Sequence, residues 1–115
     1  GRHGDVFRIG TTFLSYQKFQ KILIDKFDFV GSIQLHLHPG DAVKKESVLI
    51  KIENLFNVTQ TPESLHKLFL AEYPDLNLVV NLDKVLDFSV EIVKKSEMES
   101  SASTGKLRSV IDHRN

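Results

Sequence analysis

The 115-residue sequence contains no cysteine. This absence excludes a disulfide framework, a thiol nucleophile and a thiolate metal site, and it favours a reducing compartment. Also absent are an apolar run near the roughly 20 residues that span a bilayer and an N-terminus with a signal-peptide layout. The chain also has no net charge, because fifteen basic residues balance fifteen acidic ones. A balanced surface attracts neither nucleic acid nor anionic membrane over long range. We therefore expect an intracellular protein, in the cytoplasm or the nucleus.

The composition indicates one globular domain. Hydrophobic residues make up 41% of the chain and charged residues 26%, which is ordinary for a soluble protein. Gly1 in place of methionine suggests a tag remnant or a piece of a larger protein. We predict a tag or linker at 1–5, a single α+β domain at 6–93, and a disordered Ser-rich polar tail or linker at 94–115.

Two segments have the apolar spacing of amphipathic helices. Between residues 13 and 27, apolar side chains recur at steps of three and four, and lysines fall largely on the opposite side. The segment 61–73 begins with Thr61 as a cap, Pro62 at the first helical position and an acidic first turn, and Pro74 is expected to end it.

Alternating polar and apolar residues predict strands at 32–38, 47–53, 76–82 and 85–93, and a weak strand at 6–9. The Pro39-Gly40-Asp41 turn predicts that the first two of these form an antiparallel hairpin. The element order favours a ferredoxin-like (split βαβ) fold, an antiparallel sheet with two helices on one face. A ubiquitin-like roll with an extra N-terminal helix is the alternative.

The spacing of Gly40-Asp41, Val43, Leu49 and Ile52-Glu53 is similar to the hairpin that presents the swinging arm in lipoyl- and biotin-carrier domains. That resemblance implies a modified lysine three positions after Glu53. Phe56 occupies this position, and phenylalanine cannot form the amide. We therefore interpret the segment as an ordinary hairpin and predict no cofactor.

His36 and His38 are the first candidates for a functional site. Two histidines that are two apart on a strand project from the same face and can bind one metal ion. Asp41 and His66 could supply a further ligand, but no spacing brings them together, and the prediction is that no metal is bound. A solvent-facing strand that happens to carry two histidines is the simpler interpretation.

No motif for a nucleophile, a phosphate loop or a zinc hydrolase is present. The segment STGK at 103–106 has only a superficial similarity to a phosphate loop. The sequence therefore predicts that the protein is not an enzyme. An RNA- or single-stranded-DNA-binding domain remains the alternative, with His36, His38, Lys18 and Lys21 as contact residues, although the predicted central strands lack the aromatic residues that stack on bases.

Several apolar residues lie off the faces assigned to the core. We expect Leu49, Leu55, Phe56 and Val79 to form a docking surface on an exposed sheet face or edge. The leading hypothesis is a non-enzymatic protein-interaction module or adaptor in a larger intracellular protein, which binds another protein or a second copy of itself. The alternative is that these residues complete the core.

Overall fold

The structure is a computed structural model that describes residues 5–114. The predicted tag or linker at 1–5 therefore lies, apart from Asp5, outside the described residues. The elements follow the order β1 (Val6–Ile9), β2 (Thr12–Ser15), α1 (Tyr16–Phe27), β3 (Ile33–His38), β4 (Glu46–Glu53), α2 (Pro62–Glu72), α3 (Pro74–Asn77), β5 (Leu86–Val93) and β6 (Val110–Asp112). None of the helices among these residues has the length and apolar character that crossing a membrane requires.

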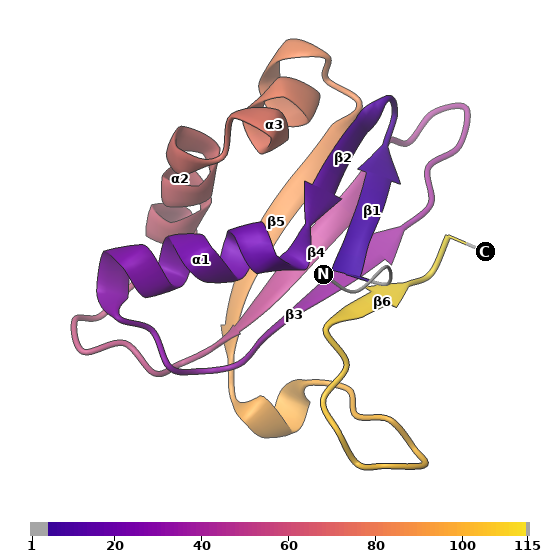
Figure 1. The fold of residues 1–115 in the computed structure, drawn as a ribbon. Helices are drawn as coiled ribbons and strands as arrows, with labels where there is room; N and C mark the ends of the chain where they lie inside the picture. The colour runs from indigo at the N-terminus through magenta and orange to yellow at the C-terminus, as the bar shows by residue number, and fades with distance from the viewer. Residues whose placement is uncertain (1–4, 115) are drawn as a thin grey trace.

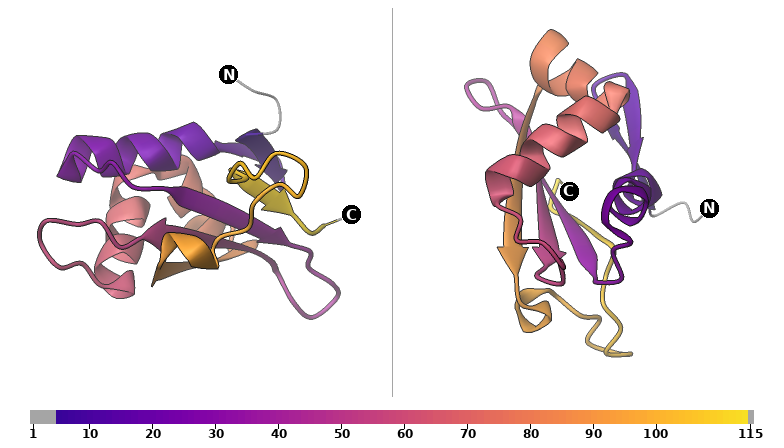
Figure 2. Two further views of the ribbon diagram at one scale, coloured as in Figure 1. Left: turned by 90° about the horizontal axis from the view of Figure 1, so that it is seen from below. Right: turned by 90° about the vertical axis from the view of Figure 1, so that its left-hand side faces the viewer.

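A four-stranded mixed sheet, in the order β5-β4-β3-β6, forms the centre of the molecule (Figure 1). β3 and β4 form the predicted antiparallel hairpin, with Ile33 opposite Ile52 and His38 opposite Ser47. β4 pairs in parallel with β5, and β3 pairs in parallel with the short β6. β1 and β2 form a separate antiparallel hairpin. Figure 2 shows this hairpin and α1 on the same side of the sheet.

The core lies between one face of the sheet and the layer of helices. Phe19 of α1 is fully buried, and its ring contacts Phe69 of α2 at 5.4 Å and Phe88 of β5 at 5.9 Å between ring centroids. Aromatic pairs at these distances add to the stabilisation from buried area. The other buried residues alternate along the strands, as the predicted period of two requires, and include Ile33, Leu35, Leu37, Val48, Ile50, Ile52, Leu86 and Val90.

Local side-chain contacts explain where the helices begin. Ser15 caps α1 by accepting a hydrogen bond from the backbone N–H of Lys18. At α2, Thr61 and Ser64 form a capping box, and Pro62 takes the first helical position. These contacts satisfy backbone N–H groups that have no partner within the helix. The predicted helix 61–73 is therefore confirmed, and the predicted helix from 13 begins three residues later, after β2.

The β3–β4 loop has the turn chemistry that the sequence indicates. The Asp41 carboxylate accepts hydrogen bonds from the backbone N–H groups of Val43 and Lys44, both at 2.8 Å, and these bonds lower the pKa of Asp41. Gly40 is required for steric reasons, because an added Cβ atom would lie 2.6 Å from the backbone nitrogen of Glu46. The loop is thus a turn held by specific hydrogen bonds, and it joins the two strands.

The predicted strand at 76–82 is wrong. These residues form α3 and a π-helical turn, Leu78–Leu82. The helix α2 ends before Pro74, as predicted, but Pro74 is also the first residue of α3. Leu76 and Val79 are buried at a helical spacing of three, whereas Leu82 is 68% exposed. A short apolar run such as this fits both the strand period of two and the helical period of about 3.6. The helical conformation is the one that buries Leu76 and Val79 against the core.

The segment predicted to be a disordered tail is ordered between 94 and 114. After a 3₁₀ turn at Lys95–Glu97, the chain passes to the other edge of the sheet and forms β6 beside β3 (Figure 1). Arg114 then binds both oxygens of Asp112 and the carbonyl oxygen of Arg8. The fourth strand of the sheet thus comes from outside the domain limits, 6–93, that the sequence suggests.

The mixed α+β class is confirmed, but the ferredoxin-like topology is not. A split βαβ unit places a strand between the two parallel strands that its helix connects. Here β4 and β5 are connected through α2 and are direct neighbours. The sheet is also mixed and not antiparallel throughout. The ubiquitin-like roll is likewise not confirmed.

Candidate functional site

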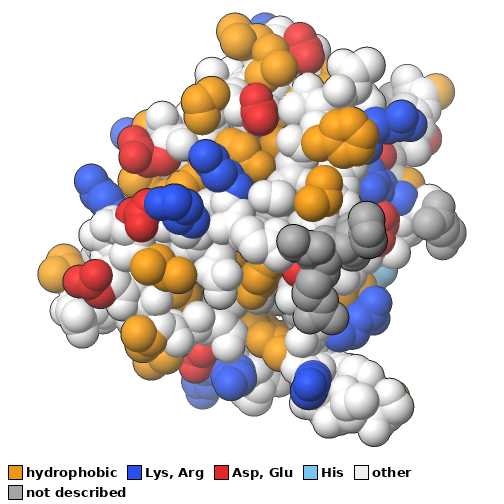
Figure 3. Space-filling model, in the orientation of Figure 1, with side chains coloured by type: hydrophobic (Ala, Val, Ile, Leu, Met, Phe, Trp, Pro, Cys, Tyr) orange, Lys and Arg blue, Asp and Glu red, His pale blue; other side chains and the backbone are white. Residues whose placement is uncertain are grey.

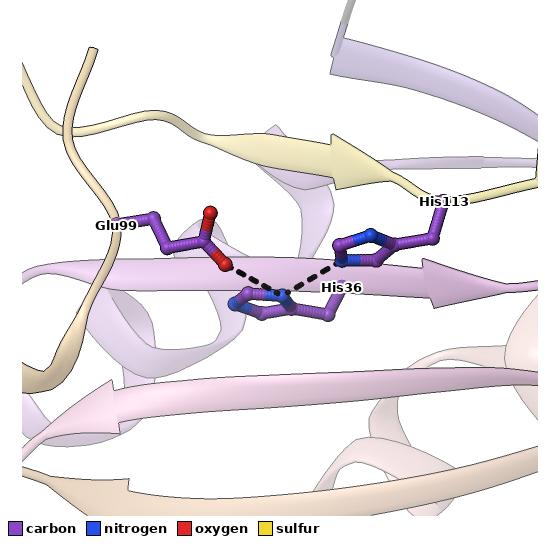
Figure 4. Close-up of side chains that lie close together, drawn as sticks. All are labelled: His36, Glu99 and His113. Carbon is purple, nitrogen blue, oxygen red and sulfur yellow. Dashed lines mark hydrogen bonds and ion pairs between the residues drawn. The ribbon is translucent and has the colours of Figure 1, made fainter. Parts of the chain in front are cut away.

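Three side chains from distant parts of the sequence meet on the outer face of β3. They are His36 in the middle of β3, Glu99 in the segment after β5, and His113 just after β6 (Figure 4). The Nδ1 atom of His36 lies 3.4 Å from Nε2 of His113 and 3.8 Å from a carboxylate oxygen of Glu99. One ligand atom of each residue lies within 4.8 Å of the others. We refer to these three residues as the histidine–glutamate cluster.

Gln34 fixes the orientation of His36. Its side-chain NH₂ donates to the carbonyl oxygens of Glu99 and Arg108, both at 2.8 Å, and its side-chain oxygen accepts from the backbone N–H of Glu99 at 2.9 Å. If this amide were flipped, its oxygen would face the two carbonyl oxygens and its NH₂ group would face the N–H of Glu99, so none of these hydrogen bonds could form. The same oxygen lies 3.0 Å from Nε2 of His36, so that nitrogen carries the proton. In the neutral ring, Nδ1 then has a free lone pair on the side of Glu99 and His113.

The surroundings of His36 favour the neutral form of its ring. Its pKa is lowered chiefly by burial and next by the positive charge of Lys51, while the Glu99 carboxylate acts in the opposite direction. His36 is 4% exposed, whereas Glu99 and His113 are exposed. The cluster therefore combines one buried imidazole of fixed orientation with two side chains that solvent can reach.

The two histidines that the sequence singles out have different roles in this geometry. His36 belongs to the cluster, but His38 stacks on the ring of His113, with 4.5 Å between centroids and 4° between planes. Asp41 lies in the β3–β4 loop, and Nε2 of His66 donates a hydrogen bond to the carbonyl oxygen of Phe88 on the other side of the sheet. Glu99 and His113 were missed, because they fall in the segment predicted to be disordered.

The predicted contact residues of the nucleic-acid alternative do not come together. Lys18 and Lys21 lie on α1, where the Lys18 ammonium is 5.9 Å from the ring centroid of Tyr73 and Lys21 pairs with Asp25 at 2.5 Å. His36 is buried, so its ring is not available to stack on a base in this structure.

The predicted docking residues are also separated. Val79 is 1% exposed and completes the core. Phe56 packs against it, with its ring 4.9 Å from Phe29 and 5.2 Å from Phe27. Leu49 is half-buried on β4, and only Leu55, at 50%, is largely exposed. Val79 and Phe56 therefore support the alternative that such residues finish the core.

A second candidate site is a polar hollow beside the hairpin 100–107. The hairpin is closed by a pairing of Ser100 with Leu107, and Gly105 in its turn has a φ of +70°. Left-handed backbone of this kind favours glycine. The hollow has a volume of about 380 Å³ and carries two cationic side chains, several hydroxyl groups and one acid; it is lined by Asp5, Ser101, Thr104, Lys106, Leu107, Arg108, Ser109 and Val110. We refer to it as the hairpin hollow.

Comparison with solved structures shows a similar fold over nearly the whole chain. A domain of phenylacetate-coenzyme A ligase from Bacteroides vulgatus ATCC 8482 matches with a TM-score of 0.52 and 17% sequence identity, over 97% of this chain and 95% of that one. No family model matches the sequence, and no curated protein matches it significantly. The prediction of a non-enzymatic protein is corrected by this match, because the similar fold is a domain of an enzyme. At this identity the likeness establishes the fold alone.

Proposed function

We propose that this chain is a domain of an acid–thiol ligase, an enzyme that joins a carboxylate to coenzyme A. The observation that carries the proposal is the fold similarity to a domain of phenylacetate-coenzyme A ligase, which extends over 97% of the chain. A match that included only the β3–β4 hairpin or one helix would not support it, since such units occur in many unrelated folds.

We propose the hairpin hollow as the place where an anionic reactant binds. Both reactants of such a ligase are anionic, because one is a carboxylate and coenzyme A carries phosphate groups. Lys106 and Arg108 line the hollow together with the hydroxyl groups of Ser101 and Thr104, and these side chains suit an anion. The backbone of Lys106 is held in the hairpin, since its carbonyl oxygen accepts a 2.7 Å hydrogen bond from Ser101 and its N–H bonds to Thr104. We propose Lys106 as the residue that contacts the anionic reactant.

The test begins with the ¹⁵N-labelled chain and coenzyme A. We expect shifts of amide signals within 100–109 on titration. Lys106→Ala should weaken binding about tenfold, the loss of one hydrogen bond to a charged group. Lys45→Ala, at an exposed lysine of the β3–β4 loop, is the matched control and should leave binding unchanged.

The decisive assay uses the full polypeptide in which this chain occurs. It measures thioester formation from coenzyme A and aryl or alkyl carboxylic acids by mass spectrometry, with a nucleoside triphosphate as the energy source. A failure to form any thioester, together with no response of the labelled chain to coenzyme A, would refute the proposal.

A role in protein contact is a second proposal, compatible with the first. Phe13 is 62% exposed on β2, and Leu82 and Val85, at 68% and 41%, follow α3. The turn of the β1–β2 hairpin lies against Val85, because a Cβ atom on Gly10 would be 3.8 Å from its side chain. Figure 3 shows hydrophobic side chains on this face in separate groups among charged ones. Contiguous apolar patches are typical of contact surfaces, whereas single exposed apolar residues are common, so this proposal is limited to the residues beside the β1–β2 turn. Phe13→Glu should abolish such a contact without loss of the fold.

A further inference from the structure

We propose that the histidine–glutamate cluster binds one Zn²⁺ ion through His36, Glu99 and His113, and that the ion ties the C-terminal segment to β3. The three residues come from β3, from the segment after β5 and from the end of β6 (Figure 4). They lie up to 77 positions apart in the sequence. The site is separate from the hairpin hollow and does not depend on the ligase proposal.

The distances suit a zinc ion. Two nitrogen ligands at about 2.1 Å from a tetrahedral zinc ion are about 3.4 Å apart. The two imidazole nitrogens of the cluster are 3.4 Å apart. The distance of 3.8 Å from His36 to Glu99 is a few tenths of an ångström longer. The ligand atoms of Glu99 and His113 lie within 4.8 Å of each other, so Glu99 must move toward His113 to bind the ion. The Glu99 side chain is 52% exposed, so it can move this far without disturbing the core.

His36 has the hydrogen-bond partner that a metal-binding histidine requires. Histidine ligands usually donate their second ring N–H to an acceptor, which fixes the ring and leaves the other nitrogen for the metal. Nε2 of His36 donates to the side-chain oxygen of Gln34, which is itself held by Glu99 and Arg108. Nδ1 is therefore the nitrogen that faces the other two ligands. Because Gln34 orients His36 in this way, the cluster contains one ligand held in a fixed position.

The donor set favours a transition metal over calcium or magnesium. Two imidazoles and one carboxylate are ligands that Zn²⁺ accepts, whereas calcium and magnesium prefer oxygen ligands only. Three protein ligands leave a fourth position for water. Because Glu99 and His113 are exposed, this position faces solvent and an ion can enter directly.

Zinc binding would add a third link between β3 and the C-terminal segment. The first link is the set of Gln34 hydrogen bonds, and the second is the pairing of β3 with β6. Glu99 precedes the hairpin that carries Lys106, and His113 follows it. An ion held by both residues therefore restricts the two ends of the segment that contains the hairpin.

The test measures Zn²⁺ binding to the untagged chain by isothermal titration calorimetry. All proteins carry His3→Ala, since His3 lies outside the described residues. We expect one Zn²⁺ per chain. His113→Ala and Glu99→Gln should each weaken binding at least tenfold, and both positions are exposed, so the fold should persist by circular dichroism. Titration with Co²⁺ should give the visible absorption of a four-coordinate ion.

Two further variants distinguish this site from simpler ones. His38→Ala removes the neighbour that stacks on His113, and His66→Ala removes a histidine that hydrogen-bonds to Phe88. Both should bind Zn²⁺ within about twofold of the parent protein. The proposal is overturned by a lack of stoichiometric binding, by unchanged binding in His113→Ala, or by an equal loss in His38→Ala, which would assign the ion to the His36–His38 pair. Slower hydrogen exchange at the Glu99 amide on addition of Zn²⁺ would support the link to β3.

Discussion

Replacing Gln34 with methionine should release the C-terminal segment from the sheet. Gln34 is fully buried, and its amide makes four hydrogen bonds of 2.8 to 3.0 Å with Glu99, Arg108 and His36. Methionine has a similar length and shape but makes no comparable bonds. At about 1 kcal/mol net for each hydrogen bond, the loss is about 4 kcal/mol. Detachment of the segment would return these groups to water, so we expect a loss of about 2–4 kcal/mol.

Urea unfolding and native-state hydrogen exchange measure this loss at two levels. Unfolding gives the change in global stability. Exchange reports whether the Glu99 amide, which donates to Gln34, and the Leu35 amide, which donates to Ser109 at 2.9 Å, become exposed together. Both should lose protection in Gln34→Met, because local opening of the segment exposes both donors.

Gln60→Met is the matched control for this substitution. Gln60 makes hydrogen bonds of 3.3 Å to Val58 and 3.1 Å from Ser64 in an exposed region, where water replaces them at little cost. The control should lose less than about 1 kcal/mol. If Gln34→Met is as stable as the control and the Glu99 amide remains protected, the hydrogen bonds of Gln34 do not hold the C-terminal segment on the sheet.

Three other outcomes follow from the structure. Phe69→Ala should cost about 3–5 kcal/mol in urea unfolding, because Phe69 is fully buried between Phe19 and Phe88; a loss below 1 kcal/mol would contradict the assigned core. Thr61→Ala removes the cap of α2 and should cost about 1 kcal/mol, with Thr59→Ala, in the exposed loop before it, as a silent control. The pKa values of Tyr16 and Tyr73, the two tyrosines of the chain, are raised mainly by burial. Since the folded pKa exceeds the unfolded value of about 10, this stabilisation is complete below pH 10 and is lost as the pH rises through the folded pKa; absorbance at 295 nm should show both tyrosines ionising above pH 10, and an ordinary midpoint would contradict their burial.

Elements with a regular spacing of apolar residues, or with a capping residue next to them in the sequence, could be predicted. The helix α2 has Thr61 as its cap and Pro62 at its first position, and β3 and β5 alternate over six and eight residues. In each case local chemistry and the final packing favour the same structure. The hairpin of β3 and β4 is also local, since one turn at Gly40-Asp41 sets its register.

Elements that depend on distant contacts could not be predicted. β6 has only three residues, and its strand conformation comes from pairing with β3 some 75 positions earlier. Gln34 and His36 alternate with apolar residues and therefore look solvent-facing, yet the C-terminal segment covers them. The same cause hid the candidate site, because Glu99 and His113 acquire their neighbours only when this segment folds back.

Hydrogen bonds and strand pairing join the segment after β5 to β3. Without the segment, β3 would become an edge strand with unpaired backbone groups, which is a hazard for self-association. Its amide at Leu35 and its carbonyl at Leu37 would lose their partners, Ser109 and His113. Gln34 would also lose the acceptors of its buried amide. A polar, serine-rich composition therefore does not by itself indicate a free tail. Here backbone atoms of Glu99 and Arg108 in the polar segment are the hydrogen-bond partners of Gln34, which is buried on β3.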